Sequence, residues 1–476
     1  MIKRNLTMLT DFYELTMANG YFESGRVNEI GYFDMFFRRV PENGGFAILA
    51  GINELIDYLC DLEFTEEDIE YLREKNMFSE GFLDYLANFK FECDVWAVPE
   101  GTAVFPGEPL LTVRGPLIQA QLIETMVLLL INHQSLIATK ANRIVRAAKG
   151  RPVLEFGSRR AQGASAAILG ARAAYIGGCA GTACTIADRD MGITALGTMA
   201  HSWVQTFPTE YEAFKTYAEV YPDNCVLLVD TYNVLKSGVP NAIRVFKEMK
   251  PKKMGIRIDS GDVSYLTKKA RKMLDEAGFP DASICASNDL DEYLLMDLKV
   301  QGAKINVWGI GTNLITSKDC PAFGGVYKLA AIMNERGEFV PKIKISENSA
   351  KITNPGNKTI YRIYDNETGK MKADLICFVG EQFDTNKDLV LFDPIDTWKK
   401  TILEGGTYTM REILVPIFRK GECIYKSPSV KEIAAYCREE KETLWDETKR
   451  FFNPHKVYVD LSDKLYSVKR ELLSKV

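Results

Sequence analysis

Between residues 150 and 310, short apolar runs alternate with amphipathic stretches, and this alternation constrains the fold more than any other feature. The apolar runs are Val153 to Phe156, Ile193 to Gly197, Cys225 to Val229, Met254 to Ile258, Ser283 to Ala286 and Ile305 to Trp308. Helices are expected between them, because apolar residues recur at helical spacing over Ala164 to Tyr175, Tyr211 to Tyr221, Val234 to Lys250, Val263 to Ala277 and Leu290 to Gln301. A strand followed by a helix, repeated about six or seven times, implies parallel strands joined by crossover helices. We therefore expect an irregular or incomplete parallel α/β barrel, with a doubly wound sheet as the alternative.

The regions on either side follow other patterns, so we expect three domains, residues 1–138, 139–334 and 335–476. The first region is expected to be an α+β sheet domain, with strands over Ile30 to Arg39 and Asp94 to Val98 and a buried helix over Leu117 to Asn132. The last region is expected to contain two hairpins and a charged helical tail, at Thr359 to Phe378, Arg411 to Tyr425 (turning at Lys420-Gly421) and Ser429 to Phe452.

Composition excludes several classes of function. With 46% hydrophobic and 26% charged residues and a net charge of -5, the chain is typical of a globular protein without a general nucleic-acid or polybasic membrane surface. Its 10 cysteines include no CxxC pair, which favours a reducing cytoplasm. The apolar run Met126 to Ile131 is too short to span a bilayer. The 3 histidines do not lie at ligand spacing from Cys or another His, so any metal is expected to be a hard cation carried by the substrate.

Polar residues end several of the expected strands, and a parallel barrel directs the carboxyl ends of all its strands to one mouth. The segment Ile256 to Asp262 offers an arginine, two carboxylates and a glycine at a strand end, and Asp230 ends the strand before it. An Asp that caps the following helix is the alternative explanation for either segment. Because two consecutive units end in Asp, we favour a site that binds sugar hydroxyls.

Three further strand ends carry candidate residues. Gly309-Ile310-Gly311-Thr312 follows the last strand, where barrels often build a phosphate site from glycine amides. His201 follows the run Ala195 to Ala200, and we interpret it as a nucleophile or acid/base group rather than a structural histidine. Phe156 to Arg160 offers an aromatic face and guanidinium groups, which suit a flat anionic ring.

These motifs together closely resemble those of the nicotinate phosphoribosyltransferases. The resemblance is carried, nearly from end to end of the chain, by Leu9 to Met17, Phe156 to Arg160, Gly197 to His201, Asp230 to Tyr232, Ile256 to Asp262, Gly309 to Asn313 and Lys351 to Gly356. It implies an α/β barrel joined to an N-terminal sheet domain, in a homodimer that shares its sites across the interface. The implied reaction joins nicotinate to phosphoribosyl pyrophosphate, giving nicotinate mononucleotide and pyrophosphate, and it is coupled to ATP hydrolysis in the salvage of NAD.

The resemblance also implies a role for individual residues. His201 becomes transiently phosphorylated, and Asp230 and Asp259 hold ribose hydroxyls and magnesium-bound water, so that Mg²⁺ is bound through pyrophosphate and water rather than directly. The pyridine ring lies between Phe156 and Tyr13 of the partner subunit, with Arg159 and Arg257 near its carboxylate or the phosphates. The 5′-phosphate is received by Ser287, Asn288, Gly309, Gly311 and Thr312, with Arg38 reaching it across the dimer.

Three alternatives stay open from the sequence. The related enzymes that use nicotinamide resemble this chain in several motifs but carry an Asp at the position of Ala183, where it accepts from the carboxamide; its absence here favours the acid. A catalytically silent binding protein would be free to lose His201, Asp230, Arg257 and Asp259. An aldolase-type barrel would need a lysine at a strand end, and none fits.

Overall fold

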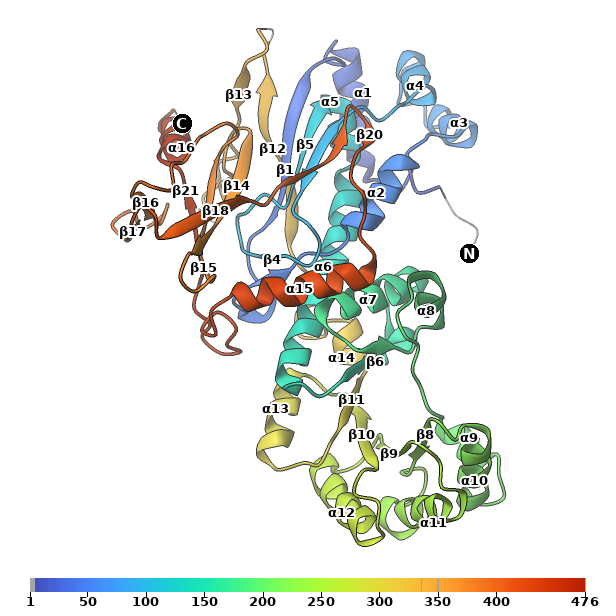
Figure 1. Cartoon of the computed structure of the whole chain (residues 1–476). Helices are drawn as coiled ribbons and strands as arrows, with labels where there is room; N and C mark the ends of the chain where they lie inside the picture. The colour runs from blue at the N-terminus through green and yellow to red at the C-terminus, as the bar shows by residue number, and fades with distance from the viewer. Residues whose placement is uncertain (1–4, 335, 349–350, 476) are drawn as a thin grey trace. The chain divides into compact units, whose positions relative to one another are not determined.

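The computed structural model describes residues 5–334, 336–348 and 351–475 (Figure 1). By its internal contacts the chain forms two compact units. The sheet unit comprises Met1–Leu136, Ala322–Pro428 and Ala435–Val476, and the barrel unit comprises Ile137–Pro321 and Ser429–Ala434. Most of the residues that the sequence analysis divides between a first and a third domain thus belong to one unit. That residues 335–476 also form a domain of their own stays a prediction.

The barrel unit contains a curled sheet of six parallel strands, which confirms the expected irregular α/β barrel (Figure 1). In spatial order the strands are β7 (Gly181–Thr182), β6 (Val153–Glu155), β11 (Val307–Ile310), β10 (Ser283–Asn288), β9 (Met254–Ile258) and β8 (Cys225–Leu228). Among the strands of this sheet, β6 comes first along the chain and β11 comes last. These two strands pair with each other, so the sheet curls back toward its own start. All strand carboxyl ends therefore lie at one edge.

Helices follow these strands as the periodicity predicts. They are α7 (Ala164–Gly177), α8 (Thr185–Met191), α9 (His201–Gln205), α10 (Glu210–Val220), α11 (Val239–Met249), α12 (Val263–Glu276), α13 (Glu292–Val300) and α14 (Thr312–Ile315), with short turns η2 (Ser158–Arg160) and η3 (Val234–Gly238). The apolar sides of β8, β9 and β10 pack against α10, α11 and α12 in one continuous core, which includes the buried side chains of Phe214, Leu227, Phe246 and Ile256.

The expected strand over Ile193 to Gly197 is wrong. Only Ala195 makes a β-bridge, with Thr182 of β7, and residues 196–200 run without regular structure. The run contains one glycine and one threonine, and the neighbouring strand β7 is only two residues long, which is too short to extend the ladder. His201 is consequently the first residue of the short helix α9, not the end of a strand.

The sheet unit is built mainly from antiparallel strands. Its larger sheet has the order β13 (Phe339–Pro341), β12 (Gly325–Met333), β1 (Ile30–Phe37), β5 (Leu111–Pro116), β3 (Asp94–Ala97), β19 (Val415–Arg419) and β20 (Glu422–Cys423). A second sheet has the order β18 (Tyr408–Glu412), β14 (Lys358–Asp365), β15 (Met371–Phe378) and β21 (Tyr458–Leu461). Two small ladders pair β2 (Ala47–Ile48) with β4 (Ala103–Val104) and β16 (Leu389–Phe392) with β17 (Lys400–Leu403).

The hairpin predicted over Thr359 to Phe378 is confirmed by β14 and β15. The second predicted hairpin is shorter than expected, because Arg411 belongs to β18 and only β19 and β20 form the hairpin. Its turn at Lys420-Gly421 is where the sequence places it. A side chain at Gly421 would come within 1.7 Å of the Phe91 carbonyl oxygen, so only glycine fits there.

The helices of the sheet unit include α1 (Phe12–Glu23), α2 (Ile52–Cys60), α3 (Glu66–Glu74), α4 (Glu80–Ala87) and α16 (Asp463–Ser474). The charged tail forms α15 (Val430–Thr443), which is shorter than predicted and has its first residues in the barrel unit and the rest in the sheet unit. The expected buried helix consists of α5 (Leu117–Leu122) and α6 (Glu124–Ala148). The stretch Leu117–Ala148 is long and apolar enough to cross a membrane, but 72% of its most apolar window is buried inside the protein. Such burial is typical of a core helix.

Candidate functional site

Arg257, on β9, joins several of the predicted residues at the carboxyl edge of the parallel sheet. Its Nε donates to Ser287 Oγ at the end of β10 (2.7 Å), and its Nη2 donates to Asp259 Oδ1 (2.7 Å). Its Nη1 reaches the hydroxyl of Thr198 and the carbonyl of Met199 at 3.3 and 3.4 Å. Because the guanidinium is planar and its donors point in fixed directions, these bonds set the position of the charge.

Asp259 lies just beyond the end of β9 and stays ionised. Its Oδ1 also accepts a hydrogen bond from Ser287 Oγ (2.5 Å). Burial raises the pKa of Asp259, but the hydrogen bonds from Ser287 and Arg257 and the charge of Arg257 outweigh burial and hold the pKa below its usual value. The carboxylate is therefore a fixed negative charge at neutral pH.

Asp230 follows β8 and binds the backbone of the next strand end. Its Oδ2 accepts from the backbone N–H of Asp259 (3.0 Å) and from Ser260 Oγ (2.6 Å). Its Oδ1 is buried and has no hydrogen-bond partner among the residues that the structure describes. A buried oxygen without a partner is costly, so this atom is where we expect a ligand hydroxyl or a bound water.

His201 meets the same group of residues from α9. Its Nδ1 is 3.1 Å from the hydroxyl of Thr231, and its Nε2 is 4.0 Å from Asp259 Oδ2. The side chain is 41% exposed. The imidazole thus lies beside the carboxylate and remains accessible from solvent.

We call His201, Asp230, Arg257, Asp259 and Ser287 the acidic cluster. Phe156 lies at its border, because the Arg257 guanidinium carbon lies 5.7 Å from the centre of the Phe156 ring. Gly309 makes room for this ring, since a side chain there would approach the ring to 2.7 Å and Ser287 Cβ to 3.2 Å. An aromatic face beside a fixed cation suits a flat anionic ring.

The remaining predicted residues of the barrel unit follow or end β6, β10 and β11, and among the described residues they make no hydrogen bond to the cluster. Asn288 ends β10, is exposed, and accepts from the N–H of Asp289. Gly311 and Thr312 begin α14 after β11, and a side chain at Gly311 would meet the Phe156 carbonyl oxygen at 3.1 Å. Arg159 is exposed on η2.

Of the two explanations for the motif Ile256 to Asp262, helix capping is confirmed for Asp262 alone. Asp259 belongs to the acidic cluster, whereas Asp262 caps α12 by accepting from the N–H of Tyr265 (2.9 Å). Gly261 between them adopts φ +83°, a left-handed conformation that separates the two side chains.

The sequence analysis assigned no role to three residues that support the site. Thr231 contacts His201, and Thr198 contacts Arg257. Glu155 is fully buried at the end of β6, where it accepts from the Gly157 N–H and from Thr182 Oγ1 and so holds the backbone next to Phe156. A carboxylate within a short apolar strand is a signal that could have identified Glu155; the threonines have no comparable signal.

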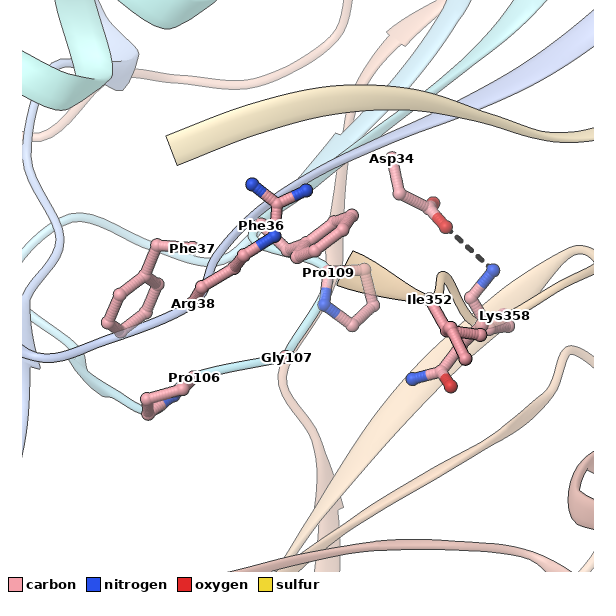
Figure 2. A pocket seen from close by; sticks show the side chains of 10 residues that line it. Asp34, Phe36, Phe37, Arg38, Pro106, Gly107, Pro109, Ile352 and Lys358 are labelled. Carbon is pink, nitrogen blue, oxygen red and sulfur yellow. Dashed lines mark ion pairs between the residues drawn. The ribbon is translucent and has the colours of Figure 1, made fainter. Parts of the chain in front are cut away.

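Tyr13 and Arg38 belong to the sheet unit. Tyr13 lies in the first turn of α1 and is exposed. Arg38 follows β1 and borders a cavity of about 190 Å³ that Asp34, Phe36, Pro109 and Lys358 also line (Figure 2). Lys358 Nζ is paired with Asp34 Oδ2 at 2.7 Å, so the net charge of the cavity lining rests on Arg38.

A half-barrel of parallel strands with ionised side chains clustered at its carboxyl edge defines the class of protein, an α/β-barrel enzyme. The N-terminal and C-terminal domain models of nicotinate phosphoribosyltransferase match residues 8–132 and 357–469. The chain belongs to the nicotinate phosphoribosyltransferase family.

Individual relatives agree with this. The chain is 44% identical to the nicotinate phosphoribosyltransferase of Bacillus subtilis, over 99% of its own length and 96% of the relative's. It is 30% identical to the human nicotinate phosphoribosyltransferase, over 98% of its own length and 96% of the relative's. The crystal structure of human nicotinic acid phosphoribosyltransferase superposes with a TM-score of 0.86 at 28% identity, covering 97% of this chain and 99% of that one.

Proposed function

We propose that the protein joins nicotinate to phosphoribosyl pyrophosphate, forming nicotinate mononucleotide and releasing pyrophosphate, with ATP hydrolysis coupled to the reaction. The observation that carries this proposal is the acidic cluster, in which His201 and Asp259 lie 4.0 Å apart although they come from different strand–helix units. Membership of the nicotinate phosphoribosyltransferase family supports the choice of substrates.

The charges of the cluster suit this chemistry. The pyridine nitrogen forms a bond to the anomeric carbon of ribose while the bond from that carbon to pyrophosphate breaks, and pyrophosphate leaves with the electron pair. Positive charge develops on the ribose in the transition state. The fixed carboxylates of Asp259 and Asp230 stabilise that charge because their positions do not depend on the substrate. The unpartnered Asp230 Oδ1 is available to a ribose hydroxyl.

We assign the pyridine ring to the face of Phe156, with Tyr13 of the partner subunit on its other face. Arg257 and Arg159 are assigned to the carboxylate or the phosphates. The 5′-phosphate is assigned to Ser287, Asn288 and the glycine segment Gly309, Gly311 and Thr312, and Arg38 of the partner subunit to the same phosphate. A homodimer is part of this proposal, since Tyr13 and Arg38 would complete the site.

Mg²⁺ fits the residues of the cluster as a cation held through pyrophosphate and water. The carboxylate oxygens of Asp230 and Asp259 suit hydrogen bonds from magnesium-bound water, and the buried Asp230 Oδ1 has no partner among the described residues. When bound, Mg²⁺ neutralises the charge of the departing pyrophosphate.

The 10 cysteines are free thiols in the structure, which agrees with an enzyme of the cytoplasm.

The acid rather than the amide is the proposed substrate because of Ala183. The Ala183 N–H donates to the Glu155 carbonyl at 2.8 Å, so this residue follows β7 beside the strand that leads to Phe156. An Asp at this position would repel a carboxylate and accept from a carboxamide. Ala183 is exposed and does neither.

Pyrophosphate release tests the proposed function. With phosphoribosyl pyrophosphate, ATP and Mg²⁺, we expect stoichiometric pyrophosphate and nicotinate mononucleotide from nicotinate, and turnover at least about 100-fold lower with nicotinamide. The Ala183→Asp variant is expected to lose activity with nicotinate. Equal turnover of both substrates would contradict the assignment to the acid, and no pyrophosphate from either would contradict the reaction.

Phosphorylation of His201 is tested separately with ATP labelled at the γ-phosphate. We expect acid-labile label on the wild-type protein and none on His201→Ala, because this imidazole is accessible and lies beside Asp259. His455→Ala is the matched control and is expected to label fully. Equal label on wild type and His201→Ala would refute the role of His201.

A further inference from the structure

The buried carboxyl group of Glu14 connects the segment that carries Tyr13 to the start of the long helix α6. Glu14 is the residue after Tyr13 in the first turn of α1, and its side chain is completely buried. One carboxyl oxygen accepts from Thr10 Oγ1 and the other from Thr125 Oγ1 (2.9 Å). Both ends of the carboxyl group are thus used, one by the segment before α1 and one by α6.

Further bonds close this connection. The N–H of Asp11 donates to Thr125 Oγ1 at 3.0 Å, and Thr10 Oγ1 also lies 3.3 Å from the Leu122 carbonyl oxygen. Asp11 is the N-cap residue of α1 but makes no side-chain cap bond. The first turn of α1 is therefore held mainly by Glu14 and Thr125, because its own cap does not hold it.

Filling space in the core does not by itself explain why a carboxyl group is buried at position 14, because burying it is costly. Burial raises the pKa of Glu14 to about 7, the hydrogen bonds from Thr10 and Thr125 oppose the rise, and the neighbouring charges of Glu124 and Asp11 add to it. An apolar side chain would fill the same space without the cost of burying a polar group. What it would lack is the pair of directed bonds that fixes the rotation of α1 about its own axis.

We propose that Glu14 is a positioning residue for Tyr13. Tyr13 is exposed, so little packing restrains its ring and its direction follows the backbone of the first helical turn. The proposal rests on the proposed function, in which the Tyr13 ring lies on the pyridine ring of the substrate bound by the partner subunit. Holding the turn in place before substrate arrives reduces the conformational entropy lost on binding.

The test compares steady-state kinetics of the full-length enzyme in five single variants and one double variant. Glu14→Leu and Thr125→Val remove the connection, and we expect the KM for nicotinate to rise about tenfold or more, since a displacement of about 1 Å costs up to about 100-fold. The KM for phosphoribosyl pyrophosphate and kcat should change less than about twofold, because neither depends on the Tyr13 ring. Glu14→Gln should keep the wild-type KM, because its amide satisfies both hydroxyl groups once they rotate.

Two controls separate positioning from general stability and from the proposed function. Ser79→Ala removes two hydrogen bonds, one from Ser79 to Glu23 at the other end of α1 and one that caps α4. It should therefore lower the unfolding temperature without changing the KM for nicotinate. Tyr13→Ala should raise this KM by itself, and adding Glu14→Leu to it should raise the KM no further.

The outcomes are distinct. A nicotinate KM that Tyr13→Ala leaves unchanged overturns the ring contact of the proposed function and the inference with it. A KM that rises in Tyr13→Ala but stays within twofold of wild type in both Glu14→Leu and Thr125→Val overturns the positioning role alone. An equal rise in Ser79→Ala also overturns it, because the effect would then follow stability.

Discussion

Replacing Asp259 by Asn is expected to lower kcat about 100- to 1,000-fold, the usual cost of removing one fixed electrostatic group from an active site. The change removes the negative charge while keeping the size of the side chain. Arg257 and Ser287 both donate to Asp259 Oδ1, so the Asn oxygen retains these bonds and the fold is preserved. The loss should appear in kcat more than in KM, since the charge matters most when the ribose becomes positive.

Asp262→Asn is the matched control for this prediction. It is the same chemical change three positions later, in the same loop, but Asp262 caps α12 through the N–H of Tyr265. Asn is an equally good cap, so activity should stay within about twofold of wild type and the unfolding temperature should barely move. If Asp259→Asn retains more than a tenth of the wild-type kcat, the acidic cluster is not the catalytic centre.

Arg362→Met is expected to lower the free energy of unfolding of the sheet unit by about 3–5 kcal/mol, because it leaves the buried Asp374 carboxylate without its cation. Arg362 is completely buried on β14 and binds both oxygens of Asp374 at 3.0 and 2.8 Å, with Glu440 at 3.2 Å. Burial raises the pKa of nearby Glu108 well above its usual value, and the neighbouring Asp374 adds to the rise. The carboxyl groups around Arg362 therefore already outnumber the cations that pair with them.

Urea unfolding followed by circular dichroism checks this prediction. Arg411→Met is the control, because Arg411 also binds Glu440 (2.7 Å) but is 46% exposed, and exposed ion pairs contribute about 1 kcal/mol or less. A deficit below that of the Arg411 variant would contradict the prediction.

Much of the barrel unit was predictable from the sequence, because its pattern is local. A strand buried on both faces must be apolar and a helix on its surface must be amphipathic, so the strands β8 to β11 and the helices between them were found close to their true bounds. The segment at Ile193 to Gly197 was predicted wrongly for the same reason. Its composition suits a strand, but a strand also requires a neighbour with free backbone groups, and only Ala195 has one.

The acidic cluster was predictable in membership but not in arrangement. The sequence places His201, Asp230, Arg257 and Asp259 at or just beyond segment ends, and the parallel topology then brings them to one edge. It does not show that Asp262 turns away to cap a helix, nor that Thr231 and Thr198 complete the hydrogen bonds. Those choices depend on rotamers and loop conformations that residues on other strands decide.

The sequence by itself determined the class of fold, the residue types at the strand ends and the family, because each is encoded in short segments read independently of one another. Only the tertiary structure decided that β19 and β20, late in the chain, extend the sheet begun by β1, and that Glu14 joins two helices through its carboxyl group. The physical reason is that a hydrogen bond between distant residues depends on their separation in space. A linear pattern of polarity sets which groups must be buried, but not which partner each one finds.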